Sequence, residues 1–312
     1  MSYAVTQTNP SPPGTLPCPD GNGDGLSDPL NVLGNCSNQL GLVPFRTLEI
    51  PQPLDGSNTS IWYAVANEYS RTLGAATRNS SVPSSLMVNV NQRMAFILLA
   101  PNEPLLSQAR TSRVPLVGAV AQFLEGENAN TSLNFYSDFR DGTQNDQVVG
   151  MPEVTFWANI EGRVLREVND RLDDYFNLCG FTLPPAAPFG TDNSIGPSAE
   201  GGMPFNLTAS CATAVPLPGW LTTHWSRMLY YANCAVPNCI QLVDIAGNNT
   251  QRASTIVISP GIHLNQPLRT VGVRDGYYEL ENASFLPPDN RFTQIKPSGI
   301  TANFNDLIYV VR

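Results

Sequence analysis

The chain has 312 residues, 42% of them hydrophobic and 14% charged, with a formal net charge of −9 at pH 7. This composition argues against a disordered chain and is typical of a folded, loop-rich protein with one large or two medium domains. Scattered arginines and the negative charge argue against a nucleic-acid ligand or an anionic membrane surface. The longest apolar run, residues 94–100, is far shorter than the roughly 20 residues of a membrane helix.

The six cysteines predict disulfides rather than a zinc site, because none lies in a CxxC pair. Disulfides place a protein outside the reducing cytosol. Of the many possible pairings we favour Cys18 with Cys36, Cys179 with Cys211, and Cys234 with Cys239.

The loop CPDGNGDGLSDPLNVLGNC, residues 18–36, has the pattern of a structural calcium loop. Oxygen-bearing side chains at alternate positions can meet at one hard cation, and Gly25 permits the sharp turn between them. The predicted metal ligands are Asp20, Asn22, Asp24, Leu26, Asp28 and Asn31. Asn31 gives one neutral oxygen where a tight site has a bidentate Glu, so we expect weak, extracellular-range affinity for Ca²⁺.

The alternative for this loop is a solvated turn in which Asp and Asn side chains bond to their own backbone. Against it, three carboxylates gathered by a short closed loop repel one another unless a cation lies among them. No histidine or other base lies near the loop in sequence, so the predicted ion is structural rather than catalytic.

Residues 152–180 predict one long amphipathic helix, over about 152–178, packed on a sheet. Pro152 and Glu153 suit its first turn, and Gly180 suits its end. The expected apolar face carries Trp157, Ile160, Val164, Val168, Leu172, Tyr175 and Cys179. The expected polar face carries Glu161, Arg163, Glu167, Arg171 and Asp174.

Short strands are predicted at SLMVNV, RMAFILLA, STIVIS and DLIYVV, between Pro, Gly and Asn turns. Four weak matches occur in the same order in the two halves of the chain. They are WYAVA with YYANC, RMAFILLAPNEPL with RASTIVISPGIHL, FLEGENAN with YELENAS, and NDQVV with NDLIYVV. Together they predict two related antiparallel strand-rich units, 1–150 and 151–312, in an α+β fold, with the long helix in the second.

The context of the acidic loop is distinctive. It comprises GTLPCPDGNGDGLSD (14–28), Cys36, GLVPFRTLEIP (41–51) and LDGSNTSIWYAVA (54–66), followed later by EGRVLREVNDRLDDYF, WLTTHWSRMLYYA and FNDLIYVV. This series of segments resembles prepilin-type proteins of type IV pili and type II secretion systems. The sequence departs from that pattern at Phe45, where Trp is expected, and at Glu49, where Gly is expected.

The resemblance implies an exported bacterial filament subunit, extracellular or periplasmic, whose globular head assembles with other pilin or pseudopilin subunits. Such a subunit has an apolar N-terminal helix as its membrane anchor. Here the chain opens with the polar, Pro-rich MSYAVTQTNPSPPG, so we expect a soluble head that lacks this helix. The bulk of the head favours a minor subunit over a major one.

An enzyme is not expected, and no catalytic residue is predicted. His224 and His263 lie among aromatic and aliphatic residues, and no nucleophile-elbow, phosphate-loop or HExxH pattern occurs. Paired carboxylates could serve a glycosidase. However, Glu125 with Glu127 and Glu279 with Glu281 recur at matching places in both halves, which indicates a shared structural turn.

The alternative function is a secreted, calcium-dependent adhesion or carbohydrate-binding module that recognises a surface or host ligand. Its binding surface would use exposed aromatic side chains. The candidates are Trp62, Trp220, Trp225, Tyr230 and Tyr231.

Overall fold

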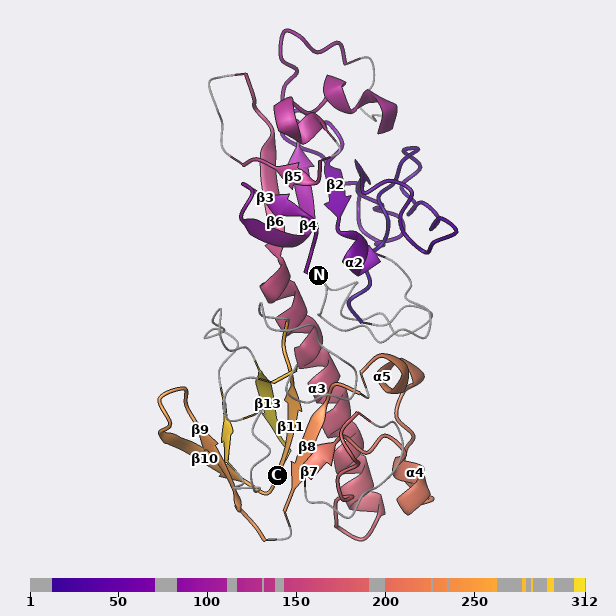
Figure 1. The fold of residues 1–312 in the computed structure, drawn as a ribbon. Coiled ribbons are helices and arrows are strands. Elements are labelled where there is room, and N and C mark those ends of the chain that lie inside the picture. Colours follow the sequence, from indigo (N-terminus) through magenta and orange to yellow (C-terminus); the bar gives the residue numbers. More distant parts are fainter. Residues whose placement is uncertain are drawn as a thin grey trace. The chain divides into compact units, whose positions relative to one another are not determined.

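The computed structural model describes residues 13–70, 83–110, 117–130, 132–137, 143–190, 200–225, 227–234, 236–262, 277–278, 282, 291–294 and 306–311. They form an α+β fold of two compact units (Figure 1). Unit 1 contains residues 14–70 and 83–156, and unit 2 begins at residue 157. No helix in these ranges is long and apolar enough to cross a membrane.

Unit 1 is built on one six-stranded sheet. Its neighbouring strands run β1-β2-β4-β3-β5, and β6 also pairs with β4. The elements are β1 (Leu40–Leu42), β2 (Trp62–Val65), α2 (Asn67–Ser70), β3 (Met87–Val88), β4 (Gln92–Ala100), the 3-10 helices η1 (Val117–Gln122) and η2 (Gly126–Ala129), β5 (Asn134–Phe135) and β6 (Gln147–Pro152).

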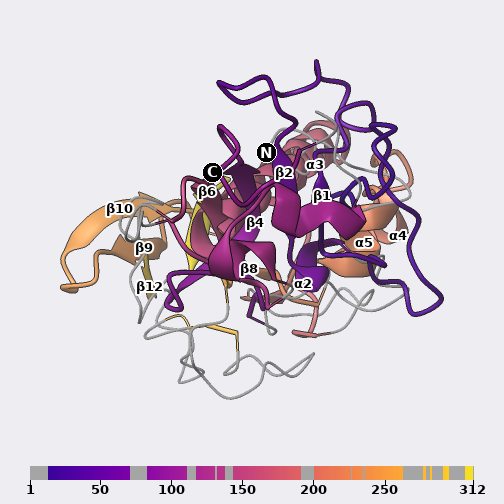
Figure 2. The same ribbon diagram turned by 90° about the horizontal axis from the view of Figure 1, so that it is seen from above.

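Unit 2 has a four-stranded sheet, β13-β11-β8-β7, and a three-stranded sheet, β10-β9-β12. Figure 2 labels β9, β10 and β12 of the three-stranded sheet and β8 of the four-stranded one. The elements are α3 (Glu153–Leu178, which begins in unit 1), β7 (Glu200–Gly202), α4 (Leu207–Ser210), α5 (Gly219–His224), β8 (Tyr230–Asn233), β9 (Ile240–Val243), β10 (Asn249–Ala253), β11 (Thr255–Ser259), β12 (Arg291–Thr293) and β13 (Leu307–Val310).

The long helix α3 follows the sequence prediction closely. It begins at Glu153, whose buried carboxylate accepts hydrogen bonds from the Tyr69 hydroxyl and the Ser84 N–H, both at 2.7 Å. Burial raises the pKa of Glu153, and these two donors oppose the rise. Past the C-terminal end, Gly180 has φ +81°, the left-handed conformation that closes helices.

Two residues of the predicted polar face of α3 are buried: Glu167, which is 8% exposed and pairs with Arg163 and Arg171, and Glu161. Glu161 is 1% exposed, and its carboxylate accepts hydrogen bonds from the Ser259 hydroxyl and from the Gly261 N–H at 2.8 Å. The charge of Glu161 suggested the polar face, but its neighbours one helical turn away, Trp157, Val164 and Leu165, are buried. The hydroxyl on β11 gives its carboxylate a buried partner.

Strand pairing repeats between the units in order and in register. The neighbours β1-β2-β4-β6 of unit 1 correspond to β7-β8-β11-β13 of unit 2. Equivalent cross-strand pairs are Gly41–Tyr63 and Gly201–Tyr231, Tyr63–Leu98 and Tyr231–Val257, and Leu98–Val149 and Val257–Tyr309. The repeat is not wholly antiparallel, because β3 pairs β5, and β9 pairs β12, in parallel.

The repeat includes a match that sequence comparison missed. The Tyr63 hydroxyl donates to the Pro17 carbonyl at 3.1 Å, and the Tyr231 hydroxyl donates to the Pro184 carbonyl at 2.9 Å. Both prolines end a Thr-Leu-Pro segment, at 15–17 and 182–184. Three letters alone were too short a signal to separate from chance.

All three predicted disulfides are confirmed. The Cα–Cα distances are 5.4 Å for Cys18–Cys36, 5.9 Å for Cys179–Cys211 and 6.4 Å for Cys234–Cys239. They close the acidic loop, fasten the end of α3 to the end of α4, and close the turn between β8 and β9. The bridges indicate an oxidising compartment outside the cytoplasm.

Candidate functional site

The acidic loop is organised around the Asp20 carboxylate. Asp20 is 1% exposed, and its side chain accepts the N–H groups of Asn22 at 3.1 Å, Gly23 at 2.7 Å and Gly25 at 2.6 Å. Its backbone pairs with Leu42 through two hydrogen bonds of 2.8 and 2.9 Å. Asp20 therefore fixes the turn and joins it to the unit 1 sheet.

Gly25 joins the acidic loop to the PFRTL segment, residues 44–48. It has φ +83°, and a Cβ on it would lie 2.6 Å from the Phe45 ring, so only glycine fits. Its carbonyl accepts the Arg46 N–H at 2.8 Å, and the Thr47 hydroxyl accepts the Ser27 N–H at 2.8 Å. The two segments form a single structural unit.

The next predicted ligands lie on the exposed edge of this turn. Asn22 Oδ1 accepts the Asp24 N–H at 3.0 Å, and Asp24 Oδ1 accepts the Leu26 N–H at 2.8 Å. The Leu26 and Asn22 hydrogen bonds lower the pKa of Asp24. Asp28 returns to the start of the loop, where its Oδ1 accepts the Gly21 N–H at 3.2 Å.

Asn31 belongs to a separate turn. Its Oδ1 accepts the N–H groups of Leu33 at 2.9 Å and Asn35 at 3.1 Å. Within the described residues, no three His, Cys, Asp or Glu side chains gather where they could hold a metal ion. Calcium binding by the six predicted ligands stays a prediction.

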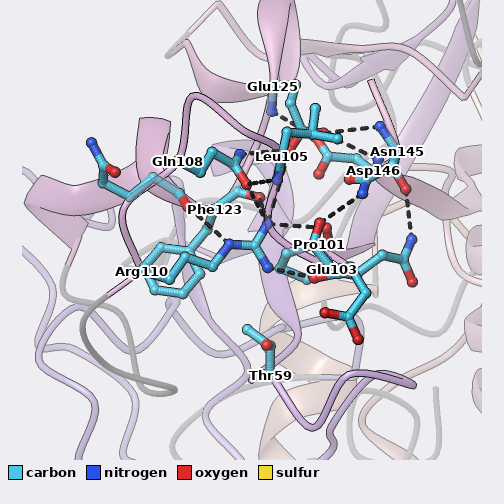
Figure 3. A network of polar contacts seen from close by, with 12 residues as sticks. Thr59, Pro101, Glu103, Leu105, Gln108, Arg110, Phe123, Glu125, Asn145 and Asp146 are labelled. Atoms are coloured by element: carbon cyan, nitrogen blue, oxygen red, sulfur yellow. Dashed lines mark hydrogen bonds and ion pairs between the residues drawn. The ribbon is translucent and has the colours of Figure 1, made fainter. Parts of the chain in front are cut away.

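A second acidic cluster lies near the end of β4 (Figure 3). Glu125 Oε2 accepts the N–H groups of Asn145 at 3.1 Å and Asp146 at 3.2 Å, while Asp146 Oδ2 accepts the Glu125 N–H at 2.8 Å. Burial raises the pKa of Asp146 to about 8, and the neighbouring Glu125 adds to the rise. Asp146 Oδ1 has no donor within the described ranges, which disfavours its charged form.

Arg110 lies beside this carboxylate pair, 4.0 Å from Glu125 Oε1. Its guanidinium donates to carbonyls of Asn102, Pro101, Gln122 and Phe123 and to the side-chain oxygen of Gln108 (Figure 3). Because its donors bond to these oxygen atoms, the Arg110 guanidinium stabilises the segments that carry them. Glu127, the predicted partner of Glu125, is instead exposed and bonded to Asn130. The pair Glu279 and Glu281, like His263, lies outside the described residues.

The candidate aromatic binding surface belongs to the core. Trp62, Trp225 and Tyr231 are 0% exposed. Tyr230 and Trp220 are 1% and 8% exposed, and His224 is also buried. These side chains are therefore not available as an exposed platform for a sugar or a protein.

An open apolar groove of about 490 Å³ lies on one face of the unit 1 sheet, and we call it the unit 1 groove. Its floor carries Tyr63 on β2, Phe96 and Leu98 on β4, and Val149 on β6, and one wall carries Leu48 and Ile50. Val149 is 67% exposed and Ile50 45%. The sequence signal of this groove is RMAFILLA on β4. An unbroken apolar strand is typical of a sheet with both faces covered, so it indicates an apolar surface on each face of β4.

Searches of the chain against protein-family models, curated proteins and solved structures find no match. The functional conclusion therefore depends on the residues and the fold.

Proposed function

We propose that this chain is the head of an exported, non-enzymatic filament subunit, similar to a minor pilin or a pseudopilin. The observation that carries the proposal is α3 of unit 2. This 26-residue helix lies against β11 of a four-stranded antiparallel sheet (Figure 1). A helix on such a sheet, with disulfide-closed loops, is the head architecture that the resemblance implies.

The acidic loop has a structural task in this proposal. Asp20 and the Cys18–Cys36 bridge already order its first turn, and we propose that Ca²⁺ stabilises the exposed edge at Asn22, Asp24 and Asp28. The partners are other pilin or pseudopilin subunits. The adhesion alternative has no specific support, because its aromatic residues are buried.

The test follows the full-length gene product in the bacterium that produces it. Filaments are sheared from the cells, sedimented and probed with an antibody against the β9–β10 hairpin. We expect the protein in the filament fraction, and we expect its loss when the peptidase that processes prepilins is deleted. A protein free in the medium, unchanged by the deletion, would contradict the filament role and favour a secreted module.

A further inference from the structure

The acidic loop contains the sole Asn-Gly pair of the 312-residue sequence, Asn22–Gly23. The Cγ atom of an asparagine can be attacked by the backbone nitrogen of the next residue, and glycine permits the closest approach because it has no Cβ. Gly23 has φ +81°, and Asn22 is exposed at the edge of the turn. The pair is therefore accessible to water and has the composition that favours this reaction, which is deamidation.

The turn places a base on the attacking nitrogen. The Gly23 N–H donates to Asp20 Oδ1 at 2.7 Å, and Asp20 is 1% exposed. A backbone amide nitrogen attacks only as its proton leaves, and a carboxylate in direct contact can accept that proton, which is general-base catalysis. Two backbone hydrogen bonds to Leu42 hold Asp20 in place, so its carboxylate keeps this position.

The same turn polarises the group that is attacked. Asn22 Oδ1 accepts the Asp24 N–H at 3.0 Å, and this donor stabilises the negative charge that forms on the oxygen when a nitrogen adds to Cγ. Asn22 Nδ2, the nitrogen that leaves as ammonia, donates to Asp24 Oδ2 at 3.0 Å. The attacking nitrogen, the developing oxyanion and the leaving group therefore each have a partner within one short loop.

The next pair along the loop, Asp24–Gly25, has equivalent contacts but a different electrophile. The Gly25 N–H donates to Asp20 Oδ2 at 2.6 Å. The Leu26 N–H donates to Asp24 Oδ1 at 2.8 Å. A carboxylate resists attack, because addition of the nitrogen would bring a second negative charge onto the same group. The neutral amide of Asn22 has no such obstacle, so Asn22 is the reactive position of the loop.

We propose that Asn22 is a site of spontaneous deamidation, with the Asp20 carboxylate as the base. A bond forms from the Gly23 nitrogen to Asn22 Cγ, and the bond from Cγ to Nδ2 breaks. The proton that Asp20 takes from Gly23 is returned to the leaving nitrogen, which departs as ammonia. Water then opens the succinimide at either carbonyl and gives aspartate or isoaspartate. The reaction needs no enzyme, so the product accumulates as the protein ages.

Deamidation changes the charge of the loop at a predicted calcium ligand. Either product carries one more negative charge than Asn22, and isoaspartate also lengthens the main chain by one methylene group. An aspartate there would give the proposed calcium site a further carboxylate, and calcium affinity depends on the charge of the ligands. This consequence rests on the proposed calcium role, whereas the deamidation itself does not.

The test incubates the purified 312-residue chain in chelator at neutral pH and follows Asn22 by peptide mapping and mass spectrometry. We expect replacement of the amide NH2 by OH, faster in the folded chain than in the same chain unfolded in urea. Asp20→Asn keeps an oxygen acceptor for the Gly23 N–H but lacks the base, so its rate should be at least ~tenfold lower. The matched control is Asp28→Asn, which should keep the wild-type rate, since Asp28 accepts the Gly21 N–H instead.

Slower deamidation in the folded than in the unfolded chain would overturn the proposal, because the turn would then protect Asn22. Equal rates in the wild type and in folded Asp20→Asn would overturn it too. If Asp20→Asn does not fold, the comparison of folded with unfolded wild type decides alone. Calorimetric titration measures the consequence separately, and Asn22→Asp should bind Ca²⁺ more tightly than the wild type. Absence of heat in both chains would contradict the calcium role and leave the deamidation rates unchanged, so the two proposals fail separately.

Discussion

Asn282 donates a hydrogen bond from Nδ2 to Asp306 Oδ2 across 3.0 Å, and in unit 1 the equivalent Asn128 donates to Asp146 Oδ2 across 3.4 Å. Each amide also accepts the N–H of one further residue at 2.8 Å and donates to the carbonyl of that same residue, which is Thr293 at the end of β12 or Tyr136 just after β5. These contacts explain why ENA and ND recur in the sequence. The same buried hydrogen-bond arrangement, which we call the Asn–Asp latch, therefore occurs once in each unit.

Asn128→Ala and Asn282→Ala should therefore cost similar amounts. Each removes three hydrogen bonds and leaves buried backbone groups unpaired, so we expect about 2–4 kcal/mol less free energy of unfolding. Urea denaturation measures the loss. Asn169→Ala, at a half-buried position of α3 whose amide makes an i,i+4 hydrogen bond to Asp173 at 3.2 Å, is the control and should change stability by less than ~0.5 kcal/mol. A large cost in one unit alone would show that the two latches are not equivalent.

The raised pKa of Asp146 predicts that the free energy of unfolding falls as pH rises. Its folded pKa of about 8 lies above its value in the unfolded chain, so the folded state holds the proton more tightly. Stability from this group is complete below the unfolded pKa and is lost as pH rises through the folded pKa. Between about pH 5 and 8 we expect a decline of roughly 1 kcal/mol per pH unit.

Asp146→Asn removes that proton and should flatten the decline, measured as urea midpoints at several pH values. The surface substitution Asp170→Asn should leave the slope unchanged. Glu125, which accepts the Asp146 N–H, and Arg110, which lies 4.0 Å from Glu125, are not substituted in either variant. A wild-type midpoint that does not move between pH 5 and 8 would refute the buried proton.

The sequence predicts those features that depend on local patterns. The period of Trp157, Ile160 and Val164 identified α3, and Gly180 marked its end. Cysteine spacing identified the three bridges, because Cys18–Cys36 and Cys234–Cys239 each close a short loop.

Features that depend on partners from distant elements were not predictable. The charge of Glu161 suggests a surface residue, although its helical neighbours Trp157 and Val164 are apolar and buried. Its hydrogen-bond partner Ser259 lies 98 residues later in the chain. Asn31 follows Asp20 at the spacing of a calcium loop, and this spacing does not predict that its Oδ1 accepts the N–H groups of Leu33 and Asn35. Position in the chain could not show which of these oxygens would meet.

Glu49 occupies a left-handed backbone position that favours glycine. Its φ is +56°, and left-handed backbone strains any residue with a Cβ. Glu49→Gly should relieve the strain and raise the free energy of unfolding by about 0.5–1 kcal/mol, despite the greater freedom of glycine in the unfolded chain. Thermal unfolding measures the gain. Glu49→Ala keeps the Cβ and should give no such gain, and equal gains in both variants would point to the lost charge instead.

The calcium prediction is tested by two aspartates with different tasks. Asp20 is bonded to three backbone N–H groups of the loop, so Asp20→Ala should lower the melting temperature in calcium and in chelator alike. Asp24 is exposed and bonds only within its own turn. Asp24→Ala should therefore lower the melting temperature in millimolar calcium and leave it nearly unchanged in chelator. Calorimetric titration of the calcium-stripped chain should show heat that the Asp24 variant lacks. If the wild-type chain gives no heat and its melting temperature is the same in both buffers, Asp20 and the disulfide order this loop without an ion.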